Sequence, residues 1–417
     1  MKDKLLKEIE KRQNELYSLL KQLININSES FGNVGNEKAV AEFIEKFFIE
    51  NGMKADLYSP DSIEGIKENP DYMPGHNLEN RPDVTGILKG KKSERRLMLM
   101  SHSDTVPIGD EKLWSFPPLS GELRDGKVWG SGDGDDKYGI AVALFLMKLI
   151  KELGVELNYD LLFTAYSDEE YGGGNGALAA CLKYKCDDYL NMDHKKLELC
   201  ISAMGGGDVK IEIASDTPTS SCANTVKGVQ ILNEDIATFR EARVKELLAD
   251  EIYKDSIIPK NSVILLEAKA GDDGNDLDKG HIIVEYYTNK TEDLINKEFE
   301  ELRVRADKRL AEIGFKVSNK EKTTRDFHYQ RSDMDNNTVA EKLQTAAKEI
   351  LGRDLVVLGA VLSDLSLILK YGSSKTVGFG IGRDFDVYGG AHQRDEFIEC
   401  SDLLAFSKTI GTFLLDY

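Results

Sequence analysis

The sequence predicts an α/β protein: a larger split domain with a mostly parallel central sheet flanked by helices, interrupted by a smaller inserted α/β domain. Two observations predict this architecture. Apolar runs typical of strands alternate with amphipathic helix patterns before residue 204, and the pattern and motif content change there. A chain of 417 residues, 41% of them hydrophobic, is long enough for two or three domains with buried cores.

The first part of the chain begins with expected helices and continues with expected strands. Apolar residues recur at helical spacing over 2–24, and a second helix is expected over 37–50, where an Asn-Gly pair ends it. The proline-containing segment 59–82 is expected to be a long loop. Further expected elements are strands at 54–58, 84–88, 97–100 and 160–166 and a helix at 136–153.

The pattern of expected helices and strands changes near residue 204, and recognisable motifs become fewer. Helix-like runs occur at 235–249 and 296–313, a strand is expected at 281–287, and the acidic stretch 270–280 is expected to be a solvated loop. A helix pattern resumes by about residue 335, and a buried strand is expected at 375–380. We therefore predict one domain formed by 1–203 and 331–417, with an inserted domain at 204–330.

Charge and hydropathy exclude several classes of protein. Lys and Arg total 54 against 73 Asp and Glu, a formal net charge of −19, which disfavours nucleic acid and anionic membranes as partners. The longest apolar run, Ile140–Met147, has 8 residues, far fewer than the ~20 that span a bilayer. No signal-like segment opens the chain, and 5 cysteines without a C-x-x-C pair indicate free thiols in a cytoplasmic protein.

Acidic and imidazole side chains follow several expected strands. The segments SHSDTV, GSGDGDD, SDEEYGG, NMDH and GGAHQRDEF supply His102, Asp104, Asp135, Glu169, Glu170, Asp193 and His392. Ligands of open α/β sheets bind beyond the carboxyl ends of the strands, so these segments point to one crevice. Each segment alone has an ordinary explanation, such as a helix cap, but their joint occurrence in a chain with 6 histidines favours a functional site.

Carboxylates gathered in one crevice require neutralisation, and two divalent metal ions would provide it. Mixed imidazole and carboxylate ligation suits zinc, with cobalt or manganese as alternatives. The lack of thiolate ligands argues against a structural zinc site.

The motifs together resemble those of the zinc peptidase and deacylase family of acetylornithine deacetylase, succinyl-diaminopimelate desuccinylase, aminoacylase, carboxypeptidase G and bacterial dipeptidases. SHSDTVP, WGSGDGDDK, SDEEYGG and GAHQRDEF match the family's signatures in order, and the likeness covers about 1–204 and 330–417. The resemblance implies metal-dependent amide hydrolysis and a cis peptide bond between Asp135 and Asp136. It also implies a ferredoxin-like inserted domain, with a four-stranded sheet and two helices, that acts as a lid and can form a homodimer.

The resemblance further implies a role for each residue of the crevice. The metal ligands form two sets that share one aspartate: His102, Asp135 and Asp193 for one ion, and Asp135, Glu170 and His392 for the other. Glu169 is the expected general base, which takes a proton from water and returns it to the leaving amine. Asp104 is expected to fix the tautomer of the His102 imidazole.

Three departures from the family pattern bear on the substrate. Ser131 replaces the usual arginine of the second signature, and the glycine that normally follows its lysine is displaced to Gly139. The stretch 211–228 lacks the histidine that family lids carry, and the segment Glu285-Tyr286-Tyr287 lacks the usual arginine. An alternative to the enzyme is therefore a catalytically impaired relative that binds metal or small peptides.

The substrate class stays open between dipeptides and N-acyl amino acids. In the resembling family, the ligand at the position of Asp193 tends to be aspartate in aminopeptidases and dipeptidases and glutamate in deacylases. The segment RPDVTG is closer to the deacetylases.

Two other functions fit the sequence less well. A dinucleotide-binding G-x-G-x-x-G fingerprint would need glycine at position 135, where an aspartate would repel a pyrophosphate. Neither aspartate-rich stretch, 133–136 or 270–280, continues into the calcium-binding EF-hand pattern.

Overall fold

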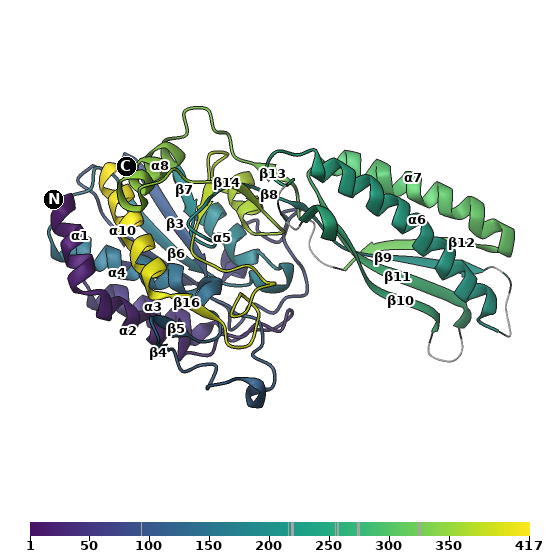
Figure 1. Cartoon of the computed structure of the whole chain (residues 1–417), viewed down its shortest axis with the longest axis horizontal. Helices are drawn as coiled ribbons and strands as arrows, with labels where there is room; N and C mark the ends of the chain where they lie inside the picture. Colours follow the sequence, from purple (N-terminus) through teal and green to yellow (C-terminus); the bar gives the residue numbers. More distant parts are fainter. Residues whose placement is uncertain are drawn as a thin grey trace. The chain divides into compact units, whose positions relative to one another are not determined.

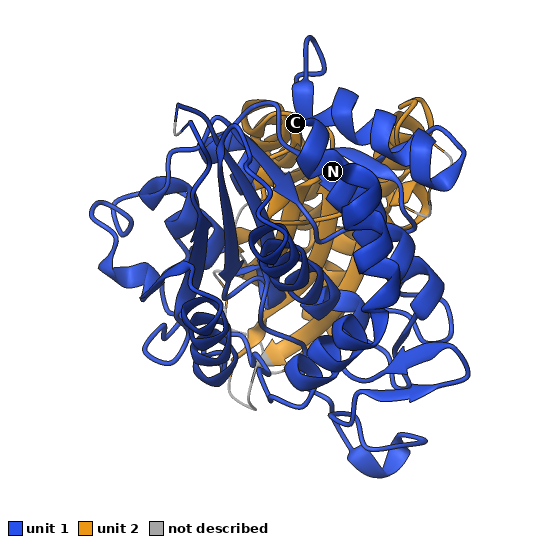
Figure 2. Cartoon of the chain, turned by 90° about the vertical axis from the view of Figure 1, so that its left-hand side faces the viewer, with its two compact units in different colours: residues 1–202, 331–358, 367–417 blue, residues 203–330, 359–366 orange. Residues whose placement is uncertain are grey.

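The structure, a computed structural model, describes residues 1–417 except 93, 216, 218–220, 255, 257, 273–275 and 324–326. The described residues form two compact units (Figure 2). Unit 1 contains Met1–Ser202, Arg331–Leu358 and Leu367–Tyr417, and unit 2 contains Ala203–Gln330 and Gly359–Ser366. Unit 2 thus includes a short segment from beyond the predicted insertion, and the domain limits at 204 and 330 stay a prediction.

Unit 1 is built on a nine-stranded sheet. Its strands are β1 (Lys54–Tyr58), β2 (Asp83–Leu88), β3 (Arg96–His102), β6 (Asp160–Tyr166), β7 (Asp188–Asn191), β8 (Leu199–Ala203), β13 (Gln330–Arg331), β14 (Val357–Ala360) and β15 (Val377–Phe379). The order is β1-β2-β6-β3-β7-β15-β8-β13, and β14 also pairs with β8. The central strands β6, β3, β7 and β15 are parallel, whereas the pairs β1–β2, β2–β6 and β15–β8 are antiparallel.

Helices cover both faces of this sheet, as the side chains of β3 indicate. Met98 and Met100 belong to the same buried cluster as the apolar side of α5 (Asn175–Lys183). Leu99 alternates to the other face and pairs with Phe163 of β6, whose ring lies 6.4 Å from that of Phe48 in α3 (Lys38–Glu50). Burial on both faces gives the continuous apolar run seen in the sequence. The predicted α/β class, with a central parallel sheet flanked by helices, is confirmed.

The remaining helices of the chain outside the inserted segment are α1 (Lys2–Lys11), α2 (Gln13–Ile24), α4 (Tyr138–Glu152), α8 (Thr338–Leu351), α9 (Leu365–Leu367) and α10 (Cys400–Asp416). The single helix expected over 2–24 is two helices, because Arg12 leaves helical geometry at φ −105° and ψ 19°. Its guanidinium pairs with Glu152 of α4 at 2.5 Å, a contact that the helical periodicity did not reveal. The terminal helices α1 and α10 lie side by side (Figure 1).

A small antiparallel sheet joins a strand near the C-terminus to two strands from the first part of the chain. It consists of β4 (Glu122–Arg124), β5 (Lys127–Trp129) and β16 (Phe397–Glu399) in the order β16-β5-β4. The rings of Trp129 and Phe397 lie 4.6 Å apart and anchor β16 to β5. This pairing brings the C-terminal segment next to the turn that follows β5.

Unit 2 contains a four-stranded antiparallel sheet covered on one face by two helices (Figure 1). The strand order is β10 (Val263–Asp272), β11 (Asp276–Thr288), β9 (Gly205–Ser215) and β12 (Phe315–Lys322), and the helices are α6 (Ala223–Leu248) and α7 (Glu292–Leu310). Val209, Ile211 and Ile213 alternate along β9 into a core shared with both helices. The sheet and two helices implied by the resemblance are confirmed.

Two sequence expectations in this unit were wrong. The described residues of the expected loop 270–280 belong to β10 and β11, which pair Ala270 with Gly280, while 273–275 lie outside the described residues. The helix expected over 235–249 begins at Ala223. Its first turns contain Gly228, where a Cβ atom would lie 2.7 Å from Ile213 Cδ1. Close packing against the sheet therefore favours glycine here, although glycine has a low helix propensity and weakens the helix pattern in the sequence.

In the part of the chain that the structure describes, the five cysteines form no disulfide bond. Among the described residues, no helix combines the length and the apolar character needed to cross a bilayer.

Candidate metal centre

Three parallel strands deliver site residues to one edge of the unit 1 sheet. His102 ends β3 opposite Tyr166, the last residue of β6, and Asn191 ends β7 opposite Met100. Since the strands run in the same direction, the residues that follow them emerge at one edge. These residues are Asp104 after β3, Asp168, Glu169 and Glu170 after β6, and Asp193 after β7.

The Asp135 carboxylate comes from a tight turn, Asp133–Lys137, that directly precedes α4. Asp135 and Asp136 have non-helical backbone angles in this turn, and the peptide bond between them is cis. The cis bond implied by the resemblance is therefore confirmed. Glu396, which precedes β16, accepts a hydrogen bond from the Gly132 amide at 3.0 Å and so supports the turn.

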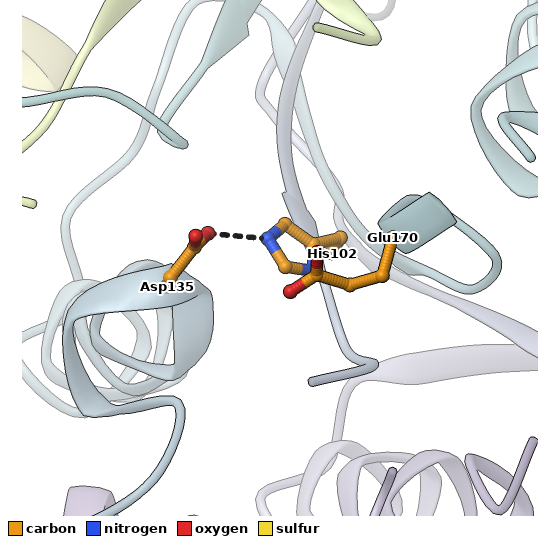
Figure 3. A group of neighbouring side chains, drawn as sticks. All are labelled: His102, Asp135 and Glu170. Carbon is orange, nitrogen blue, oxygen red and sulfur yellow. Dashed lines mark hydrogen bonds and ion pairs between the residues drawn. The ribbon is translucent and has the colours of Figure 1, made fainter. Parts of the chain in front are cut away.

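Asp135 lies between two imidazoles that are far apart in the sequence. Its Oδ1 atom is 2.8 Å from His102 Nε2, and its Oδ2 atom is 3.2 Å from His392 Nε2. His392 Nε2 also lies 3.1 Å from the Glu170 carboxylate. Figure 3 shows the Asp135 carboxylate facing the His102 ring and the Glu170 side chain extending from its own turn toward the same ring. One atom from each of His102, Asp135 and Glu170 falls within 4.8 Å of the others, close enough to share a metal ion.

A second group of potential ligands contains Asp193. It consists of His102, Asp136 and Asp193, with ligand atoms within 4.8 Å of one another. The family resemblance implied Asp135, not Asp136, beside His102 and Asp193. Burial and the Asp193 carboxylate raise the pKa of Asp136 well above its ordinary value, which shows how crowded the negative charge is here.

The carboxylates favour positive charge at both imidazoles. Burial lowers the pKa of His392, but Asp135 and Glu170 raise it more, to about 11. Burial likewise lowers the pKa of His102, and Asp104 and Asp135 outweigh it, holding the pKa well above its ordinary value. Divalent cations would supply this positive charge while leaving the imidazoles neutral, as metal ligands must be. These residues therefore fit a site for divalent metal ions.

Asp104 connects the ends of β3 and β6. Its carboxylate accepts hydrogen bonds from the backbone amides of Glu169 at 3.1 Å and Glu170 at 3.0 Å. His102 Nδ1 is 3.0 Å from the Asp104 carbonyl oxygen and 3.5 Å from its carboxylate. The backbone oxygen of Asp104, rather than its side chain, is thus the nearer partner of the ring.

The two histidines of unit 2 lie beside carboxylates of the same unit. His281 Nε2 lies 3.0 Å from Glu267, and His328 Nδ1 lies 3.7 Å from Glu292. The Tyr287 hydroxyl donates a hydrogen bond to Glu285 at 2.9 Å, in the segment that lacks the family's arginine. These contacts assign neither histidine a catalytic role.

A buried cation beside Asp104 was missed by the sequence reasoning. Arg81 is 0% exposed and contacts the carboxylates of Glu37, Asp104 and Asp168. The segment RPDVTG was noted only for its resemblance. The available signal was an arginine just before a strand, with acidic residues at a helix start and after two other strands, but no sequence spacing connects them.

Comparison with known proteins points to one family. The model of "Peptidase family M20/M25/M40" matches residues 98–416. An uncharacterised metallohydrolase of Methanocaldococcus jannaschii is 27% identical over 446 residues, covering 96% of this chain and 98% of that protein. The N-formyl-4-amino-5-aminomethyl-2-methylpyrimidine deformylase of Halalkalibacterium halodurans is 28% identical over 207 residues, covering 49% of this chain and 44% of the deformylase.

Solved structures share the fold over nearly the whole chain. A tripeptidase of Staphylococcus aureus has a TM-score of 0.71 at 18% identity, covering 97% of this chain and 98% of its own. A dinuclear metal binding peptidase of Bacillus subtilis has a TM-score of 0.66 at 14% identity, covering 98% of each chain. At these identities the likeness concerns the fold alone.

Proposed function

Because the chain belongs to peptidase family M20/M25/M40 and is a metal-dependent hydrolase, we propose that it cleaves the amide bond of a small peptide or N-acyl amino acid at a dinuclear centre. The observation that carries this proposal is the Asp135 carboxylate, whose two oxygens lie 2.8 and 3.2 Å from the imidazoles of His102 and His392. A carboxylate with one oxygen for each of two sites is the arrangement that a bridging ligand requires.

The proposed ligands are the five named from the sequence. His102, Asp135 and Asp193 would hold one ion, and Asp135, Glu170 and His392 the other. Asp136 is a further candidate beside His102 and Asp193. Mixed imidazole and carboxylate donors favour zinc, with cobalt or manganese as alternatives. When bound, such ions act as Lewis acids toward a carbonyl oxygen and make water more acidic.

The chain's own residues supply the proton transfers and the positioning. Glu169 would take a proton from the attacking water as the new C–O bond forms, and would give it to the departing amine nitrogen as the C–N bond breaks. The hydrogen bond from the Glu169 amide to Asp104, at 3.1 Å, limits the movement of this residue. A proton on His102 Nδ1, donated to the Asp104 carbonyl oxygen at 3.0 Å, leaves Nε2 free as a ligand.

The names of the similar proteins and the identity of one proposed metal-binding residue, Asp193, support a small amide substrate. The solved structures that share the fold include a tripeptidase, and the curated relatives include a deformylase. The aspartate at position 193 follows the family tendency of aminopeptidases and dipeptidases, whereas the segment RPDVTG is closer to the deacetylases, so the proposal keeps both substrate classes. We also propose that unit 2 acts as a lid that can form a homodimer, and that the chain, whose five cysteines form no disulfide bond in the described structure, is cytoplasmic.

Metal analysis combined with a substrate panel tests this function. The purified protein would be loaded with zinc, cobalt or manganese and assayed on dipeptides, tripeptides, and acetylated, formylated and succinylated amino acids. We expect about two metal ions per chain and turnover of at least one substrate class. A protein that binds metal but turns over none of them would instead support the catalytically impaired relative, which the missing lid histidine motivates.

Removing the metal should destabilise unit 1. Ions that bind the folded state alone add roughly 2.7 kcal/mol per site at a free concentration of about 100 times Kd, so chelation removes stability. We expect EDTA to lower the melting temperature by at least about 5 °C, measured by calorimetry. Excess zinc added after EDTA should restore it. A melting temperature that does not change with EDTA would contradict the metal site.

A further inference from the structure

Arg81 is a completely buried guanidinium, 0% exposed, surrounded by carboxylates. Its Nε atom donates to Glu37 Oε1 at 2.6 Å, its Nη1 atom pairs with Asp168 Oδ1 at 2.7 Å, and its Nη2 atom lies 3.5 Å from Asp104 Oδ2. Two neutral acceptors complete its contacts: the carbonyl oxygen of Gly32 at 3.0 Å and the hydroxyl of Ser30 at 2.9 Å. The donors of this side chain are therefore directed to fixed points on several loops.

Two of these contacts act on the same short segment. Asp168 directly precedes Glu169 and Glu170, so its ion pair with Arg81 fixes the start of that segment. Asp104 accepts hydrogen bonds from the amides of Glu169 and Glu170, at 3.1 and 3.0 Å, and fixes the part that follows. Arg81 thus contacts both side chains that hold the proposed base and a proposed metal ligand.

The backbone of this segment depends on such contacts. Asp168 has a φ of 65°, in the left-handed region that few residues other than glycine adopt and that aspartate adopts when its side chain is hydrogen-bonded locally. Its side chain is held by Arg81, by His76 Nδ1 at 2.7 Å and by Asn175 Nδ2, which donates to it at 2.9 Å. Loss of the Arg81 contact would remove one of the three interactions that maintain this geometry.

We propose that Arg81 is a positioning residue of the metal centre. Its guanidinium orients Asp104 and Asp168, and through them it holds Glu169 and Glu170 in place for proton transfer and metal binding. Within the part of the chain that the structure describes, the hydrogen bonds and ion pairs of Arg81 go to Glu37, Asp104, Asp168, Gly32 and Ser30, and none of these is a proposed metal ligand. The inference rests on the proposed function, because it assumes that Glu170 binds metal and Glu169 moves a proton.

Lysine cannot replace the guanidinium in this role. Arginine presents five donors in a planar fork, whereas lysine offers one compact ammonium group. The Arg81→Lys variant keeps the positive charge but cannot contact Glu37, Asp104 and Asp168 at once. It separates positioning from charge alone.

Cobalt binding tests the proposal without a substrate. The wild type, Arg81→Lys and the control Arg95→Lys would be titrated with Co²⁺ and followed by visible absorption. Arg95 also pairs with a carboxylate, Asp188, at 2.5 Å, but it precedes β3, about 20 Å along the strand from His102. For Arg81→Lys we expect the dissociation constant of the more weakly bound Co²⁺ ion to rise at least about tenfold and the visible spectrum to change. Arg95→Lys should have the affinity and the spectrum of the wild type.

Activity gives the second measurement. With cobalt at saturation, we expect Arg81→Lys to lower kcat about 100-fold with KM within about threefold, while its circular dichroism stays that of the wild type. Unchanged cobalt affinity, spectrum and kcat would overturn the proposal. If Arg81→Lys does not fold, the double variant Arg81→Gln, Glu37→Gln removes the cation together with one carboxylate, and the same outcomes decide. A wild type that binds no cobalt would overturn the proposed function, and the inference with it.

Discussion

We expect the Glu169→Gln variant to lose at least about 10³-fold in kcat while it keeps its metal ions. Glutamine has the size of glutamate but cannot accept a proton, so the transfer from water to the leaving amine is lost. The backbone amide of residue 169 would still donate to Asp104, at 3.1 Å in the wild type, so the segment should keep its position. Steady-state kinetics on a substrate from the panel, together with metal content, measure both effects.

Glu156→Gln is the matched control for this variant. Its side chain is 69% exposed and pairs with Lys91 at 3.0 Å, away from the strand ends that carry the site residues. We expect its kcat to be within about twofold of the wild type, since exposed ion pairs contribute little. If Glu169→Gln kept more than a tenth of the wild-type kcat, another group would have to be the base.

The Asp135→Asn variant should lose metal and activity together. Each oxygen of Asp135 contacts a different imidazole, at 2.8 Å for His102 and 3.2 Å for His392. Asparagine keeps one oxygen and places an amide nitrogen, which is a poor ligand, at the other position. Substitution of outer partners of metal ligands costs about 10–100-fold in metal affinity or activity, so losing a shared ligand should cost at least about 10³-fold in kcat.

Metal content after dialysis measures the first part of this prediction. We expect about two ions per chain in the wild type and one or fewer in Asp135→Asn. Asp188→Asn serves as the control, because Asp188 is a buried carboxylate, 9% exposed, that pairs with Arg95 at the other end of the sheet. Two ions retained in Asp135→Asn would exclude the bridging role.

The sequence revealed the elements whose signal is local. Strand β6 was expected over 160–166 and has those bounds, because a buried parallel strand is a short, continuous apolar run between turns. The helix expected over 2–24 was wrong at Arg12, where an ion pair with Glu152 accompanies the break. Helical periodicity is the same on both sides of such a break, so the sequence pattern does not show it.

The candidate site was found because its residues follow strands in motifs a few residues long. His102, Asp135, Glu170, Asp193 and His392 could each be named from such a segment, and the family resemblance gave them roles. Which of the acidic and imidazole side chains face one another could not be predicted from these segments. Asp136 groups with His102 and Asp193, and His392 reaches Glu170 across 222 residues of sequence.

What the sequence determined by itself is therefore the fold class, the family resemblance and the identity of the proposed ligands, because strand periodicity and short motifs are properties of neighbouring residues. The tertiary structure alone decided which carboxylate faces which imidazole, and that Arg81 holds Asp104 and Asp168 behind them. Such contacts depend on how separate loops pack at the end of a sheet. The distance between two side chains on different loops is set by the packing of the whole domain, which no local pattern encodes.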